Sequence, residues 1–288
     1  MTTTTSDNSY LRFTKHHGAG NDFLVQVDPG SSGPLLPELV QALCDRHYGV
    51  GADGVIRVLD GGGVADVTMV LQNADGSVAE MSGNGMRCLA QAAVQSALVT
   101  PPTFTVSTAA GIMTVSYAQG SDPDTAWATV GMGPAVLGEN QEQRFADRRV
   151  RRVDMGNPHL VMFGPDVASV DVAGIGSHLQ DAYAELGGIN VEFIASGDEP
   201  DTLVLRVFER GVGETQACGT GSAAAAAAAQ SWGLVGTRVA VENPGGTLEV
   251  TLEEHGILLA GPVHRVASVV VSPDAVLAAA RPQGRLVP

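Results

Sequence analysis

The stretch AEMSGNGMRCLA, residues 79–90, joins a glycine-rich turn to the start of an apolar helical run. The first N–H groups of a helix lack intrahelical partners, so those of Gly83, Asn84 and Gly85 are expected to point at a bound anion. Ser82 is the side chain best placed to cap this turn, but its hydroxyl does not titrate near neutral pH. The stretch therefore predicts an anion-binding turn that presents a serine.

A second stretch repeats this pattern in the other half of the chain. NADGSVAEMSGNGMRCLAQAA (73–93) and ERGVGETQACGTGSAAAAAAA (209–229) both place a polar approach before the pattern S/C-G-x-G and a helix. KHHGAGNDFLVQV (15–27) and VDMGNPHLVMF (153–163) open the two halves in a similar way. Internal similarity of this kind indicates two related α/β units that can face each other across a cleft.

The expected helices and strands follow from hydrophobic periodicity and from the Gly, Pro, Asn and Asp residues that mark the turns between them. Helices are predicted from about residue 82 to 98 and from about 218 to 232. The segment 131–140 is the expected linker, and 274–288 is expected to be a short helix or a disordered tail. Short strands are predicted at 23–27, 54–59, 67–73, 104–108, 112–118 and 126–132.

Composition narrows the class of protein. The chain has 16 basic and 31 acidic residues, a formal charge of −15, without a dense basic cluster, which argues against nucleic acid as a partner. Its three cysteines lack metal-ligand spacing, so neither a disulfide framework nor a metal site is expected. No stretch approaches the ~18 apolar residues of a membrane span, and residues 1–10 form a polar start. We expect a soluble cytoplasmic protein that binds no membrane.

Cys218 is the expected reactive thiol. A cysteine at a helix start has its thiolate stabilised by the terminal N–H groups and the helix dipole, whereas Cys44 and Cys88 are expected to be buried and inert. If the halves face each other, Ser82 and Cys218 meet across the cleft. Two acid/base groups on opposite faces of a carbon permit inversion, and helix N-termini would hold the carboxylate of the substrate, so no pyridoxal lysine is required.

These motifs together resemble the diaminopimelate epimerase family along nearly the whole chain. They are HGAGNDF, GVGADG, NADGS, SGNGMRC, GNPH, ERGVGETQACGTGSA and ENPGGTL. The resemblance implies an isomerase that interconverts LL- and meso-diaminopimelate by two-base proton transfer, in lysine and peptidoglycan synthesis. It also implies that the enzyme needs neither pyridoxal phosphate nor another cofactor, and that it forms a homodimer.

The resemblance implies two pseudo-symmetric α/β (α+β) domains, each with strands wrapped around one central helix, and an active site in the cleft between them. In the fold that the resemblance implies, the last strand of the chain returns to the first domain. The expected first domain is therefore 1–133 plus about 264–288, and the second is 134–263.

Site residues carry over by motif. Cys218 matches one catalytic cysteine, and Ser82 stands where the family has the other. His159 and Glu209 are implied to tune the thiols. Expected substrate-binding residues are Asn21, Asn73, Asn157, Asn190, Glu209 and Arg210, with backbone cradles at Gly83, Asn84, Gly219 and Thr220.

Two departures bear on the function. Gly54 stands where some members have a glutamine that helps to bind substrate. Ser82 is the more serious departure, because a hydroxyl is a weaker acid and base than a thiol of pKa near 8.5, so reduced activity is expected. Two other classes stay open: a cofactor-independent dehydratase or racemase of another amino acid, of hydroxyproline type, and a non-catalytic binder of amino acids.

Overall fold

The computed structural model describes residues 10–138, 143–145 and 147–280. The polar start, the end of the C-terminal tail and the last residues of the expected linker fall mostly outside these ranges. The first half contains β1 (Leu11–Gly18), β2 (Asn21–Val27), α1 (Pro37–Cys44), β3 (Gly54–Asp60), β4 (Val67–Asn73), β5 (Val78–Ala79), α2 (Gly83–Gln95), β6 (Thr103–Thr108), β7 (Gly111–Gln119) and β8 (Thr125–Gly131).

The second half follows after two short strands, β9 (Val136–Leu137) and β10 (Gln143–Phe145). Its further elements are β11 (Arg148–Asp154), β12 (Pro158–Phe163), α3 (Val172–Ala182), η1 (Ala184–Leu186), β13 (Asn190–Ser196), β14 (Thr202–Glu209), β15 (Gly213–Thr215), α4 (Gly219–Ser231), β16 (Arg238–Asn243), β17 (Gly246–Glu253), β18 (Gly256–Val271) and α5 (Pro273–Ala280). Every strand predicted from the sequence is present.

Strand pairing repeats between the halves. β1–β2 and β11–β12 are antiparallel, whereas β2–β3 and β12–β13 are parallel. The next pairs also correspond: β3–β4 with β13–β14, β4–β6 with β14–β16, β6–β7 with β16–β17, and β7–β8 with β17–β18. The predicted α/β (α+β) class with a repeated unit is therefore confirmed.

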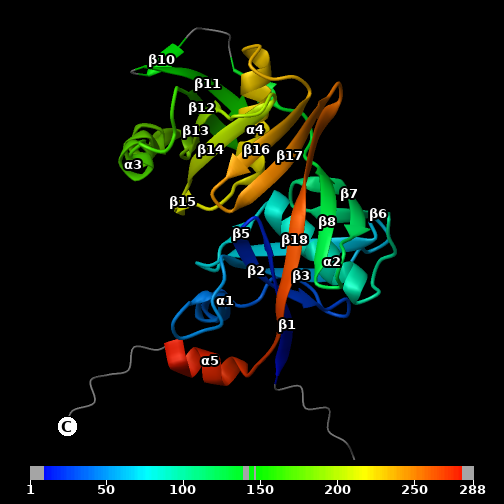
Figure 1. The fold of residues 1–288 in the computed structure, drawn as a ribbon. Coiled ribbons are helices and arrows are strands. Elements are labelled where there is room, and N and C mark those ends of the chain that lie inside the picture. The colour runs from blue at the N-terminus through cyan, green and yellow to red at the C-terminus, as the bar shows by residue number, and fades with distance from the viewer. Residues whose placement is uncertain (1–9, 139–142, 146, 281–288) are drawn as a thin grey trace, which may run out of the picture.

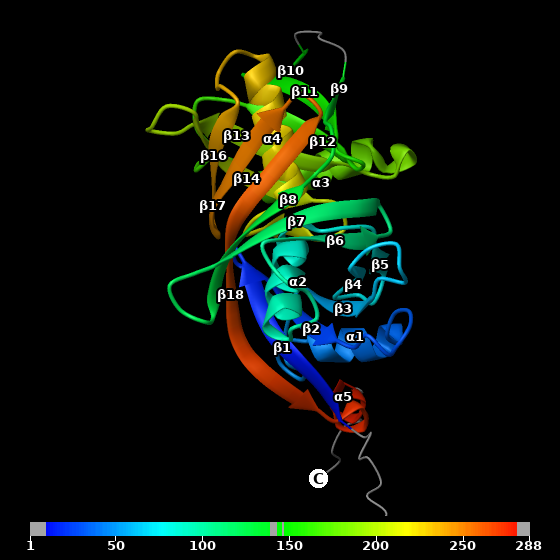
Figure 2. The same ribbon diagram turned by 90° about the vertical axis from the view of Figure 1, so that its right-hand side faces the viewer.

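A central helix fills each half. α2 packs against β1, β2, β3, β7, β8 and β18, and α4 packs against strands β11 to β14, β16 and β17 (Figures 1 and 2). The seven alanines 223–229 of α4 are all at most 7% exposed, so this part of the helix has no solvent face. Small side chains allow strands to approach α4 closely from every side.

Helix ends differ little from the prediction. α2 stops at Gln95, three residues earlier than expected, and Ala97 then takes a left-handed conformation with φ 56°. α4 ends at Ser231, before the left-handed Gly233. α1 and α3 lie where the sequence predicts no helix: α1 has only eight residues, and α3 contains two glycines, which lower helix propensity.

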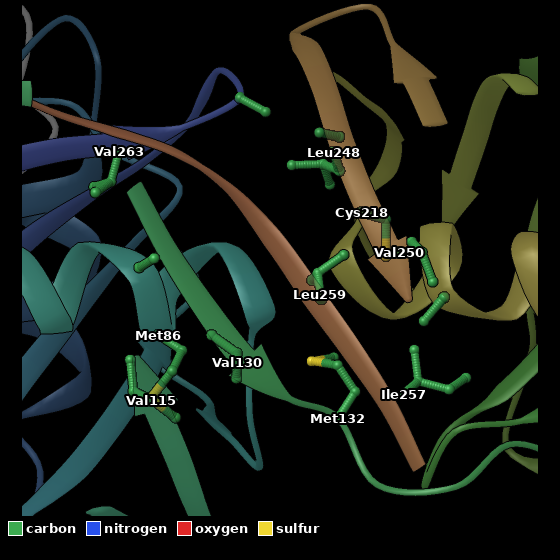
Figure 3. Close-up of a cluster of buried hydrophobic side chains, with 14 of the residues drawn as sticks. Met86, Val115, Val130, Met132, Cys218, Leu248, Val250, Ile257, Leu259 and Val263 are labelled. Atoms are coloured by element: carbon green, nitrogen blue, oxygen red, sulfur yellow. The ribbon is translucent and has the colours of Figure 1, made fainter. Parts of the chain in front are cut away.

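The long strand β18 joins the halves. Its first part pairs with β17 and β8, and its last part pairs with β1, so it runs from the upper half to the lower half (Figures 1 and 2). Buried Leu259 of β18 and Met132, which follows β8, lie between Met86 of α2 and Val250 of β17 (Figure 3). This apolar seam fixes the halves against each other. None of the described helices has the length and apolar character to cross a bilayer.

Candidate active site

The two central helices meet at their N-termini. A Cβ atom built on Gly219 would lie 3.2 Å from the Cα of Gly83, and one built on either glycine would come within 3 Å of the Leu259 side chain. These distances are shorter than nearly all real Cβ contacts, so the close approach of the two helix starts, with Leu259 beside them, favours glycine at positions 83 and 219. This contact brings the first turns of α2 and α4 to one place.

Ser82 and Cys218 cap these helices. Ser82 Oγ accepts a hydrogen bond from the N–H of Gly85 at 3.1 Å, and Cys218 Sγ accepts one from Gly221 at 3.4 Å. Both caps have an extended backbone conformation. The free first-turn N–H groups of each helix therefore point beyond its cap, as an anion site needs.

A cavity of about 150 Å³ lies at this junction. Ser82 and Cys218 both line it, as the sequence predicts. Eight further predicted residues line it too: Asn21, Asn73, Gly83, Asn84, Asn157, Glu209, Gly219 and Thr220. A fold that gathers residues from both halves into one cavity supplies the cleft expected between them.

Arg210 lies in a second cavity that adjoins the first. This cavity measures about 300 Å³ and shares Asn73, Asn157 and Thr220 with the first one. The Arg210 guanidinium donates to the carbonyl oxygen of Gly187 at 3.0 Å. The two cavities together can hold a ligand that has polar groups at both ends.

Asn190 and His159 line neither of these two cavities. Asn190 Oδ1 accepts a hydrogen bond from the backbone N–H of Arg210 at 3.0 Å, so Asn190 holds the chain that carries Arg210. His159 is fully buried and lies 2.6 Å from Glu192 through Nδ1 and 2.9 Å from Asn157 through Nε2. Both residues can act on a ligand only through their neighbours.

The surroundings of the Cys218 thiol favour its protonated form. Burial raises its pKa well above the usual value, and the nearby carboxylates of Glu209 and Glu192 raise it further. The hydrogen bonds from Thr220 and Gly221 act in the opposite direction but are weaker. The expected stabilisation of a thiolate by the helix start is thus outweighed by desolvation and by two acidic neighbours.

Glu209 is the group that can take the proton from this thiol. It accepts a hydrogen bond from Thr215 at 2.5 Å, and the Cys218 thiol lies within hydrogen-bonding reach of it. Burial raises the pKa of Glu209, and Glu192 raises it further. A carboxylate with a raised pKa is a stronger base, which suits proton exchange with a thiol.

Sequence reasoning misses Glu192 and Asp53. Glu192 is completely buried on β13, and its Oε2 atom has no hydrogen-bond partner among the described residues. Its signal is a lone acid in the otherwise apolar run VEFIA (191–195). Asp53 lines the cavity and accepts a hydrogen bond from Asn21 at 2.7 Å. It belongs to the motif GVGADG, for which the sequence alone suggests a functional difference only at Gly54.

Gly54 is constrained by the neighbouring strand. A Cβ atom there would lie 2.5 Å from the backbone oxygen of Gln72 on β4. A glutamine at this position would therefore require the β4 backbone to move. Gly54 thus allows β3 and β4 to lie close together at this position.

Comparison with known proteins places the sequence in one family. A family model described as diaminopimelate epimerase matches residues 13–138 and 151–266. The chain is 40% identical over 279 residues to a diaminopimelate epimerase of Cyanothece sp., with 89% of this chain and 98% of the relative covered. It is also 40% identical over 278 residues to one of Corynebacterium aurimucosum, with 90% and 98% covered.

Solved structures share the fold at low sequence identity. A probable proline racemase of Agrobacterium radiobacter superposes with a TM-score of 0.72 at 16% identity, covering 92% of this chain and 95% of that one. A predicted epimerase of Pseudomonas aeruginosa gives 0.69 at 17% identity, covering 91% and 99%. Because the family model spans most of the chain and the relatives are covered almost end to end, the chain belongs to the diaminopimelate epimerase family.

Proposed function

We propose that this protein is an isomerase that interconverts LL- and meso-diaminopimelate by proton transfer at one carbon. The observation that carries the proposal is the meeting of two helix N-termini at one cavity, with Ser82 on one side and Cys218 on the other. Inversion requires one group to remove a proton while another delivers a proton to the opposite face. Family membership supports the same reaction.

Cys218 is the proposed base. Its proton passes to Glu209, and the thiolate then takes the α-proton of the substrate, so the C–H bond breaks and an S–H bond forms. The pKa of both groups is raised, mainly by burial, so each of them is a stronger base than it would be in water. The Ser82 hydroxyl delivers a proton to the opposite face and regains one from solvent. Its hydrogen bond is accepted from the N–H of Gly85, and no base among the described residues hydrogen-bonds to this hydroxyl.

Both helix N-termini act on the reacting carboxylate. Negative charge moves onto this carboxylate when the α-carbon loses its proton. Oriented N–H groups at Gly83, Asn84, Gly219 and Thr220 stabilise that charge without reorganisation. This electrostatic work is the proposed reason that the reaction needs neither pyridoxal phosphate nor a metal.

The adjoining cavity is proposed to hold the distal amino-acid head of the substrate. Arg210 can pair with its carboxylate, while the side-chain amides of Asn73 and Asn157 line the passage between the cavities. Asn21 lines the first cavity, which would hold the reacting amino-acid head of the substrate. Asn190 positions Arg210. This arrangement favours a diamino dicarboxylate over a ligand with one polar end, such as proline.

We further propose a cytoplasmic homodimer with two domains, 1–133 plus about 264–288 and 134–263, serving lysine and peptidoglycan synthesis. Exposed Val266 and Val270 on β18 supply apolar surface for a second copy. Sedimentation equilibrium tests the dimer, which Val270→Asp should weaken.

The experiment that tests the function follows two signals in heavy water. The protein is incubated with LL- and with meso-diaminopimelate, and nuclear magnetic resonance records epimer ratio and loss of the α-proton signal. Exchange or inversion with diaminopimelate, and neither with proline or hydroxyproline, is expected. Reaction with hydroxyproline at a comparable rate would favour the dehydratase or racemase class instead.

A further inference from the structure

Arg87 is a buried cation that no acid among the described residues neutralises. It lies in α2, is 0% exposed, and forms no ion pair with any carboxylate of the described residues. Its Nη2 donates to Asn84 Oδ1 at 2.7 Å and its Nη1 to the backbone oxygen of Gly83 at 3.3 Å, while Nε has no partner in the described chain. The other deeply buried arginine, Arg57, pairs with Asp28.

The surroundings of Arg87 keep the guanidinium in place. A Cβ atom at Gly18 of β1 would lie 2.9 Å from Nη2, and one at Gly261 of β18 would lie 3.5 Å from the guanidinium carbon. Burial lowers the pKa of Arg87 to about 10, so the side chain still carries its charge at neutral pH. The fold therefore holds one positive charge beneath the first turn of α2.

The hydrogen bond from Arg87 decides which way Asn84 faces. A guanidinium can only donate, so Asn84 must present its oxygen to Arg87 and its amide nitrogen to the other side. That nitrogen donates to Asn21 Oδ1 at 3.2 Å and to the backbone oxygen of Ala217 at 2.9 Å. Asn21 in turn donates to Asp53 at 2.7 Å. Every bond of this chain runs in one direction, from Arg87 to Asp53.

The same chain links the two catalytic positions. Asn84 is two residues after Ser82, and Ala217 immediately precedes Cys218. The Asn84 amide therefore ties the start of α2 to the segment that carries the proposed base. An uncompensated buried charge costs free energy, and an anion seated on the first turn of α2 relieves that cost.

We propose that Arg87 is a positioning residue for the reaction, which orients Asn84 between the two halves and whose charge favours the substrate carboxylate at the start of α2. This inference rests on the proposed function. The charge of Arg87 matters most in the transition state, when the substrate carboxylate gains negative charge. Its forked hydrogen bonds matter already in the ground state, because they fix Asn84 and Asn21 before substrate arrives.

Three variants separate these roles. Arg87→Met removes charge and hydrogen bonds, and kcat/KM for diaminopimelate should fall about 100-fold, the order of loss that a misplaced active-site group can cause when the change lies away from the reacting atoms. Arg87→Lys keeps the charge but cannot form the two hydrogen bonds to Gly83 and Asn84 together, so kcat should largely recover while KM stays raised. The matched control is Arg57→Met, which removes a buried arginine outside the cavity and should leave kcat/KM close to the wild-type value.

A second readout does not depend on turnover. The side-chain amide signals of Asn84 in ¹⁵N nuclear magnetic resonance should exchange slowly with solvent in the wild type and in Arg57→Met, and rapidly in Arg87→Met. If the wild type leaves diaminopimelate unchanged, the proposed function fails, and this readout alone decides the orienting role of Arg87. A folded Arg87→Met protein with wild-type kcat/KM or unchanged amide signals would overturn the inference. Should Arg87→Met not fold, a wild-type KM in Arg87→Lys would overturn it.

Discussion

The starts of α2 and α4 have the same backbone and different chemistry. Ser82 and Cys218 have similar dihedral angles, φ −141° and ψ 124° against φ −121° and ψ 119°. Each side chain accepts a hydrogen bond from the N–H three residues further on. The repeated motif thus builds the same anion cradle twice.

What differs is the charge behind each cradle. The α2 side has buried Arg87 and a hydroxyl, whereas the α4 side has a thiol with Glu192, Glu209 and His159. The acids raise the pKa of the Cys218 thiol, and we propose that the arginine favours negative charge at the start of α2. On the proposed mechanism, the same backbone design therefore receives a proton-accepting side chain at α4 and a buried positive charge at α2, which α2 itself carries.

The largest effect should come from removing the two caps in turn. Cys218→Ala removes the proposed base, and exchange of the α-proton should fall by about 10⁴-fold, the upper range for a positioned acid or base. Ser82→Ala should cost far less, because water can replace a hydroxyl that nothing activates. Proton exchange in heavy water measures both variants. Equal losses would show that the two cradles are equivalent.

Restoring a thiol at α2 should increase the rate of inversion. In the wild type, the epimer whose α-proton faces Cys218 should exchange with heavy water while keeping its configuration, since Ser82 donates a proton poorly. Ser82→Cys should raise inversion by at least about 10²-fold. Ser82→Thr, which keeps the hydroxyl, is the control. Rapid, balanced inversion by the wild type, unimproved by Ser82→Cys, would contradict the asymmetry.

Thiol reactivity should separate the two helices. Only the thiolate reacts, and because the pKa of Cys218 is raised, its alkylation should be slow at pH 7 and should rise about tenfold per pH unit below that pKa. Cys88 in α2 and Cys44 are buried with pKa raised to about 12 and do not line the cavity, so Cys218 should be labelled first. Diaminopimelate should protect it. Peptide mapping that finds Cys88 labelled first would reverse the assignment.

The smallest expected effect compares two equivalent glycines. A Cβ at Gly221 would lie 2.8 Å from Glu192 Oε1 and 3.3 Å from Cys218 Sγ, whereas one at Gly85 would meet Ile56 and the flexible Met69 at 3.1 and 3.2 Å. Gly221→Ala should lower the free energy of unfolding by about 1–3 kcal/mol, as overpacking does. Gly85→Ala should stay within about 1 kcal/mol of the wild type, because better helix propensity offsets its crowding. Urea titration measures both, and equal losses would argue against a rigid carboxylate beneath α4.

The sequence by itself determined the repeat, the two central helices and most of the cavity. These features depend on local signals: glycines where helices touch, a capping side chain, and apolar periodicity ended by left-handed residues. Such signals are short-range, so the sequence alone predicts that Ser82 and Cys218 lie at equivalent positions and face the same cavity. The short helix α1 and the glycine-containing α3 are stabilised by packing and have weaker signals.

Only the tertiary structure decided the electrostatics. Three features depend on strands distant in sequence: no acid of the described residues pairs with Arg87, Glu192 lies beneath Cys218, and the pKa of the Cys218 thiol is raised. The residues next to Cys218 in the sequence predict a thiolate, because they indicate only the N–H groups and the dipole at the start of the helix. Desolvation and neighbouring charge are properties of the assembled interior, where a lower dielectric strengthens every interaction between charges, so no local stretch of residues encodes them.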